Sequence, residues 1–83
     1  MKVLYFAWLR ERVGTGEEDV TPPAEVATVA DLITWLAEKD EHYAYAFENP
    51  KVVRAAIDHE HVKHSAAIAG AREVAFFPPM TGG

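Results

Sequence analysis

One amphipathic stretch in the middle of the chain limits what it can fold into. Apolar residues recur there with helical spacing, at Val29, Leu32, Ile33 and Leu36. Such a stripe buries one side of a helix against a core. Thr28 stands three residues before Asp31, a variant of the capping box that places an acid near the positive end of the helix. The sequence therefore predicts one main helix that starts at Thr28.

The segment before this helix is typical of strands. Residues 2–8, Lys-Val-Leu-Tyr-Phe-Ala-Trp, are rich in β-formers and almost wholly apolar, which predicts a largely buried first strand. The charge of Lys2 favours an outward face for the even positions. Residues 9–16 predict a turn-like connection. Residues 17–20 predict a second strand, which Pro22-Pro23 confines to an irregular or edge position.

The segment after the helix returns to strands. A polar break over residues 39–41 precedes a short second helix, which Tyr43, Ala46 and Phe47 define and Asn49-Pro50 ends. The elements expected later are a strand over residues 53–58, a hairpin link over 58–61, a short strand opened by Val62, a loop over 68–70 and a strand over 73–77.

In the last strand, Glu73, Ala75 and Phe77 share an outer face, whereas Val74 and Phe76 point to the core. Strands around one substantial helix predict an α+β fold whose sheet is covered on a single side. The other face of the sheet is then left for solvent or a partner.

Composition excludes several classes of function. A chain of 83 residues, 49% hydrophobic and 25% charged, predicts one small folded domain. It has no cysteine, which excludes disulfides, zinc–thiolate sites and cysteine nucleophiles. The net charge of −5 argues against nucleic-acid or anionic-membrane partners. Since no membrane span or signal-peptide pattern is visible, we expect a cytoplasmic protein.

The carboxyl end, Pro78-Pro-Met-Thr-Gly-Gly83, is the unusual part of the chain. Two prolines favour an extended start, and six residues at about 3.1 Å each reach roughly 19 Å. Gly82 could thread a channel too narrow for a side chain, and Gly83 would carry its carboxylate to an activating enzyme. A Gly-Gly ending alone also fits an ordinary frayed terminus.

Residues 73–83, Glu-Val-Ala-Phe-Phe-Pro-Pro-Met-Thr-Gly-Gly, closely resemble the end of the small subunits of molybdopterin synthase, a family of ubiquitin-like β-grasp sulfur carriers. The resemblance extends over nearly the whole chain, through residues 2–7, 9–11, 13–14, 28–32 and 55–58. The chain departs from the family at Gly70-Ala-Arg72, at Asp58 and at His61, positions that bear on partner details.

The resemblance implies a β-grasp domain over residues 1–77, with a mixed four- to five-stranded sheet and one main helix packed on one face, and a flexible tail over 78–83. It implies that a ubiquitin-activating-type adenylyltransferase uses ATP to adenylate Gly83, which then becomes a thiocarboxylate. The sulfur would come from a donor protein and pass to cyclic pyranopterin monophosphate inside a heterotetramer with a large subunit. That subunit would supply the catalytic groups, and no cofactor is expected on this chain.

The resemblance also implies partner-binding residues. In a β-grasp sheet the first and last strands are neighbours, so Phe6 and Phe77 would lie close together on the open face. Either ring could instead fold into the core, and Arg10 could pair with the partner or remain a solvated charge. The expected partner-binding residues are Phe6, Arg10, Phe77, Pro78, Pro79, Met80 and Thr81.

Three histidines, His59, His61 and His64, have a spacing that could suit a metal ion. Because a turn would break their alternation, we interpret them as exposed turn residues and expect no metal site. No serine elbow, acid pair or phosphate-binding glycine loop is visible. The alternative functions are a sulfur carrier of the thiamine pathway and a ubiquitin-like binding module whose tail is never activated.

Overall fold

The computed structural model describes residues 1–79. Three α-helices, five strands and one 3-10 helix make up this part of the chain. In order they are β1 (Lys2–Tyr5), α1 (Ala7–Val13), β2 (Glu17–Asp19), α2 (Val29–Ala37), α3 (Glu41–Ala46), η1 (Pro50–Val52), β3 (Arg54–Ile57), β4 (Glu60–Val62) and β5 (Glu73–Phe77).

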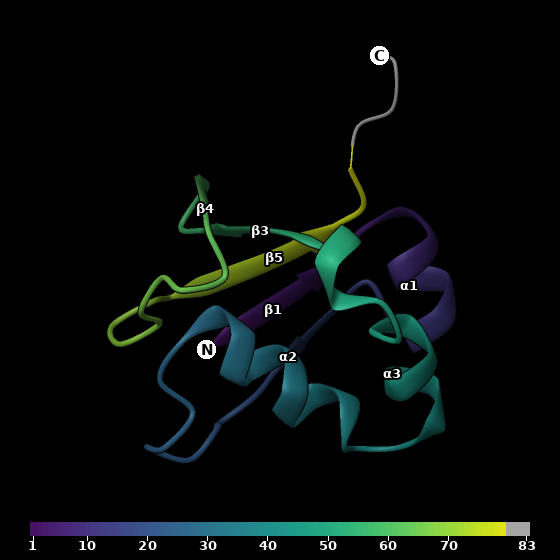
Figure 1. Ribbon diagram of the computed structural model, residues 1–83, viewed down its shortest axis with the longest axis horizontal. Coiled ribbons are helices and arrows are strands. Elements are labelled where there is room, and N and C mark those ends of the chain that lie inside the picture. Colours follow the sequence, from purple (N-terminus) through teal and green to yellow (C-terminus); the bar gives the residue numbers. More distant parts are fainter. Residues whose placement is uncertain (80–83) are drawn as a thin grey trace.

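The five strands form one mixed sheet in the order β2-β1-β5-β3-β4 (Figure 1). The central strands β1 and β5 run parallel, and the other neighbours are antiparallel. The first and last strands are therefore adjacent, as expected. The short strand β2 lies at one edge, where the prolines that follow it interrupt no ladder.

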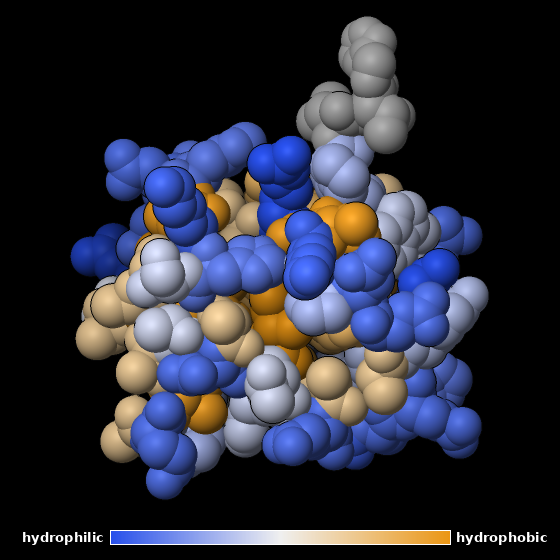
Figure 2. All heavy atoms as spheres, in the orientation of Figure 1, coloured by the Kyte–Doolittle hydropathy of each residue, from blue (hydrophilic) through white to orange (hydrophobic). Residues whose placement is uncertain are grey.

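The helices cover one face of this sheet. In β1 and β5 the side chains of Val3, Tyr5, Val74 and Phe76 point to the helices and are buried. Ala75, on the opposite face of β5, is small and is buried as well. The predicted stripe of α2, which is Val29, Leu32, Ile33 and Leu36, is buried in the same core. Hydrophilic residues dominate the surface in view in Figure 2, with hydrophobic residues visible between them. The α+β fold and the covered face are confirmed.

The main helix begins where the sequence predicted. The Thr28 side chain accepts a hydrogen bond from the backbone N–H of Asp31, and the Asp31 carboxylate accepts from the backbone of Thr28. These two bonds satisfy groups that a helix start leaves unpaired. The bonds from Ala27 and Thr28 hold the pKa of Asp31 below its ordinary value.

None of the helices in residues 1–79 is both long and apolar enough to cross a membrane.

The prediction for residues 2–13 was partly wrong. The strand ends at Tyr5, and the expected turn-like connection is the helix α1, which includes Trp8. Ala7 turns the chain with a φ of 53°, and a positive φ at a residue other than glycine leaves little trace in a sequence. Leu9 and Val13, one helical turn apart, are buried, and Gly14 ends the helix in the left-handed conformation.

The hairpin prediction was also wrong in its register. The turn is only two residues long, since Ile57 pairs with Glu60 and Ala56 pairs with His61. Asp58 and His59 both have positive φ, 48° and 73°, as a type I′ turn requires. Val62 therefore ends β4 and does not open it, and His61 belongs to a strand.

Candidate functional site

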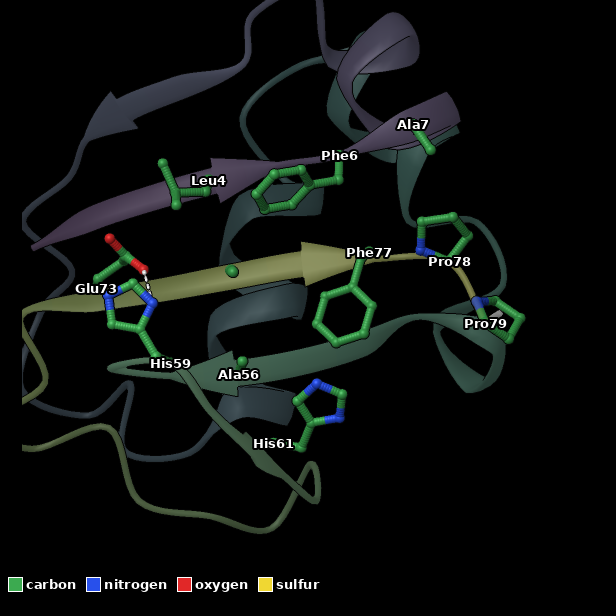
Figure 3. A pocket seen from close by; sticks show the side chains of 11 residues that line it. Leu4, Phe6, Ala7, Ala56, His59, His61, Glu73, Phe77, Pro78 and Pro79 are labelled. Carbon is green, nitrogen blue, oxygen red and sulfur yellow. Dashed lines mark ion pairs between the residues drawn. The ribbon is translucent and has the colours of Figure 1, made fainter. Parts of the chain in front are cut away.

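The face of the sheet opposite the helices carries an apolar groove of about 670 Å³. Its lining comes from β1, β3, β4 and β5, from the junction of β1 with α1, from the turn between β3 and β4, and from the two residues after β5 (Figure 3). The lining residues are Leu4, Phe6, Ala7, Ala56, His59, His61, Glu73, Ala75, Phe77, Pro78 and Pro79.

The floor of the groove is one row of side chains across four strands. Leu4 pairs with Ala75, Ala75 with Ala56, and Ala56 with His61. Directly paired residues point to the same face of a sheet. The two small alanines at the centre of this row leave a hollow, which larger side chains border on either side.

Two phenylalanines border the hollow at the end where β5 finishes. The Phe6 side chain is 48% exposed, and its backbone N–H donates to the carbonyl of Phe76 at 3.0 Å, which ties the start of α1 to β5. The Phe77 side chain is half-buried, and its ring lies 5.1 Å from the ring of His61. Exposed aromatic rings beside a hollow are typical of a surface that binds a protein.

Pro78 and Pro79 continue the same surface. Both follow β5 directly and line the groove (Figure 3). Any partner held in the groove is therefore next to the point where the chain leaves the sheet. The other residues predicted for the tail, Met80, Thr81, Gly82 and Gly83, lie outside the described residues, so the division at residue 77 stays a prediction.

Apart from Asp31 at the start of α2, the groups with perturbed pKa values form one cluster away from the groove, on the covered side of the sheet. The Glu18 carboxylate accepts hydrogen bonds from the hydroxyls of Tyr5 (2.7 Å) and Tyr43 (2.9 Å), and Lys39 lies 3.4 Å from its other oxygen. Burial alone would raise the pKa of Glu18, but these bonds and the lysine charge outweigh it and lower the pKa. Burial and the bond to Glu18 raise the pKa of Tyr43 to about 12 and that of Tyr5 further.

The groove is suited to binding a protein, and its side chains offer few groups for catalysis. Its polar side chains are the two histidines and Glu73, and His59 Nδ1 lies 3.8 Å from a Glu73 oxygen. Since the remaining lining is apolar, the arrangement favours the docking of a protein over the turnover of a small molecule.

The sequence profile of the ThiS family matches residues 3–83. The chain belongs to the ThiS family. Two curated relatives also match along their whole length. The molybdopterin synthase sulfur carrier subunit of Escherichia coli (strain K12) is 40% identical over 83 residues, covering 100% of this chain and 99% of the relative. The protein of the same name from Haemophilus influenzae is 34% identical, with the same coverage. The resemblance stated from the sequence is confirmed.

Solved structures agree on the fold of this ThiS-family chain. The crystal structure of SAMP1 from Haloferax volcanii superposes with a TM-score of 0.73 at 26% identity, covering 100% of this chain and 98% of that one. A structure from Pyrococcus furiosus named for molybdopterin converting factor, subunit 1, gives 0.71 at 26% identity, with 95% of each chain covered. The β-grasp fold is confirmed.

The structure brings together four of the residues predicted to bind a partner, namely Phe6, Phe77, Pro78 and Pro79. It does not bring Arg10 to them. Arg10 is exposed on α1 and lines a separate depression with residues 11 and 14–16. In this position Arg10 lies outside the groove of the ThiS-family chain, and a role for it in partner binding stays a prediction.

Sequence reasoning missed His61. With the expected four-residue link, His61 would lie in a turn, whereas the two-residue turn places it in the groove beside Phe77. The sequence carries no clear signal for this, because neither Asp58 nor His59 is the glycine that marks a two-residue turn. His64 lies elsewhere, with Nε2 2.7 Å from the carbonyl of Val53. Within residues 1–79 no three His, Cys, Asp or Glu side chains gather as metal ligands.

Proposed function

We propose that this chain is the sulfur carrier subunit of a molybdopterin synthase. The observation that carries the proposal is the full-length match to two sulfur carrier subunits, joined to a groove that meets the root of the Gly-Gly tail. A large subunit that grips the groove would hold the tail at a fixed starting point. The tail then has only to reach the active site of that subunit.

The chemistry takes place at Gly83. Its carboxylate attacks the α-phosphate of ATP on an adenylyltransferase, and pyrophosphate leaves. The terminal sulfur of a persulfide on a donor protein then attacks the carbonyl carbon, and AMP leaves. A thiol cleaves the resulting sulfur–sulfur bond, which forms a disulfide with the donor and leaves a thiocarboxylate on Gly83. Within the synthase this sulfur passes to cyclic pyranopterin monophosphate. The carrier needs no acid or base of its own, because the two enzymes supply them.

The proposal also includes the protein partners, the assembly and the residues that bind the partners. The large subunit, the adenylyltransferase and the sulfur donor are protein partners, and a heterotetramer is the assembly that we expect. Binding through Phe6, Phe77, Pro78 and Pro79, with Met80 and Thr81 further along the tail, belongs to the same proposal. A cytoplasmic location, no bound cofactor, no metal site and no nucleic-acid or membrane partner stay predictions.

The test is the mass of the C-terminal peptide after incubation with ATP, the cognate activating enzyme and a sulfur source. Exchange of oxygen for sulfur has nearly the mass of one added oxygen, and Met80 lies in the same peptide, so alkylation and fragment ions must place the sulfur on Gly83. A variant with one alanine appended after Gly83 is the matched control and should stay unmodified. An unmodified carboxylate on the unaltered chain, with an enzyme active on another carrier, would favour the binding module.

Complementation separates the two carrier pathways. The chain should restore molybdopterin synthesis in a strain that lacks its own small subunit. Growth of a strain that lacks the thiamine carrier, without rescue of the first strain, would assign the chain to the thiamine pathway instead.

A further inference from the structure

The sheet face that carries the groove also carries positive charge close to the tail. Arg54 is the direct partner of Phe77 in the pairing of β3 with β5. Since paired residues share a face, Arg54 lies on the groove side of the sheet. It is exposed. Arg54 does not line the groove itself, but it is the cross-strand neighbour of Phe77, which does.

Arg54 lies among basic side chains, two of which are lysines. Together with Lys51, Lys63 and His64 it lines a second depression, whose lining includes no Asp or Glu. Residues 49–57 and 61–72 contain no acid at all, although the whole chain has a net charge of −5. We call Arg54 and Lys63 the basic flank.

The basic flank has no acidic partner in the described part of the chain. Over residues 1–79, the lysine and arginine ion pairs are Lys2–Glu17, Arg12–Glu48 and Lys39–Glu18. The exposed charges of Arg54 and Lys63 are thus available to a protein that approaches the groove. Charges at the edge of an apolar interface act mainly on the rate of encounter and on the choice of partner.

We propose that the basic flank is a second part of the docking surface, and that it pairs with an acidic patch on the large subunit beside the apolar surface that fills the groove. The inference rests on the proposed function. Continuity supports it, because Arg54 and Phe77 are cross-strand neighbours. Charge also supports it, because two exposed basic side chains without an ion pair in residues 1–79 are complementary to acidic side chains of a partner.

The test is the association rate of the full-length chain with its cognate large subunit, measured with Arg54→Glu at low and high salt. The reversal should slow association by about three- to tenfold at low salt, with little change in the dissociation rate. The difference should shrink as salt screens the charges. Lys63→Glu should act in the same direction, and Arg54→Lys, which keeps the charge, should leave the rate nearly unchanged.

Arg72→Glu is the matched control. It makes the same change in net charge at an exposed residue before the start of β5, and five residues at roughly 3.3 Å each put it about 17 Å from Phe77. Equal effects of Arg54→Glu and Arg72→Glu, with Phe77→Ala still weakening the complex, would overturn this inference alone. If the unaltered chain does not bind the large subunit, the proposed function fails as well.

Inorganic phosphate distinguishes a protein patch from a small-anion site. At matched ionic strength, phosphate should slow the association of the unaltered chain no more than chloride does. A phosphate-specific effect that Arg54→Glu removes would assign the flank to a small anion and contradict the proposal.

Discussion

Phe76 and Phe77 are adjacent in the sequence and lie on opposite faces of the sheet. The Phe76 side chain is fully buried, with its ring 5.3 Å from that of Phe47 and 6.4 Å from that of Tyr5. Phe77 lies half-buried at the groove, and within residues 1–79 its one aromatic neighbour is the ring of His61. The same residue type therefore stabilises the fold at one position and forms a partner surface at the next.

The difference follows from strand geometry. Successive side chains of a strand alternate between faces, and the helices cover one face of this sheet. On the covered face, aromatic rings pack against one another. On the open face, the alanines at positions 56 and 75 leave a hollow that no part of residues 1–79 fills. The contrast predicts that stability and partner binding can be changed separately by neighbouring substitutions.

The largest effect is expected from Phe76→Ala. Removing a buried phenylalanine costs about 3–5 kcal/mol of unfolding free energy, against a total of about 4–12 kcal/mol for a chain of this length. Urea unfolding followed by circular dichroism measures the loss. Phe77→Ala is the matched control and should lose much less. A loss in Phe76→Ala no larger than in Phe77→Ala would contradict the assignment of faces.

Phe77→Ala should act on binding instead. We expect it to weaken the complex with the large subunit by at least about 1–2 kcal/mol while the fold is kept, which is about five- to thirtyfold in Kd. Titration calorimetry with the cognate large subunit measures the change. Tyr45→Ala is the control, since Tyr45 is 53% exposed but lies outside the groove. Unchanged affinity in Phe77→Ala would remove the groove from the interface.

Alternation and helical spacing predicted much of the fold. The faces of β5, the stripe of α2 and the capping box at Thr28 all follow from local patterns, and the structure has them as predicted. The helix α1 did not follow, because its first residue, Ala7, turns the chain with a positive φ. The turn at Asp58 and His59 also needs positive φ twice, and neither residue is the glycine that signals such a turn.

The sequence predicted only part of the candidate site, as it predicted only part of the fold. Phe6 and Phe77 were predicted from the resemblance to the family together with the outer faces that Lys2 and Glu73 mark in the sequence. His61 was missed because the predicted four-residue link placed it inside the turn, whereas the two-residue turn makes it a strand residue paired with Ala56. The Glu18 cluster was missed for another reason. It joins β2 to Tyr5, Tyr43 and Lys39 across 13 to 25 residues, and no local pattern records such contacts.

Glu18 also sharpens the comparison of the two faces, because it is a charge on the covered one. It pairs with the buried Val3 in the ladder of β1 and β2, and its carboxylate is held by two tyrosine hydroxyls and Lys39. We expect Glu18→Gln to cost about 1 kcal/mol at neutral pH, because hydrogen bonds to a charged group are the stronger ones. Chemical unfolding of the two proteins at neutral pH measures this difference.

The pH dependence decides whether the charge of Glu18 is the cause. The pKa of Glu18 is lowered in the folded chain from an ordinary value of 4.5, so its stabilisation is present above that value and is lost as pH falls below it through the folded pKa. The difference between the unaltered chain and Glu18→Gln should therefore shrink on acidification. Glu17→Gln is the matched control, because Glu17 is an exposed neighbour in β2; its difference from the unaltered chain should stay small at every pH. If the difference in unfolding free energy between the unaltered chain and Glu18→Gln stays the same in acid, the shape of the Glu18 side chain, and not its charge, stabilises the covered face.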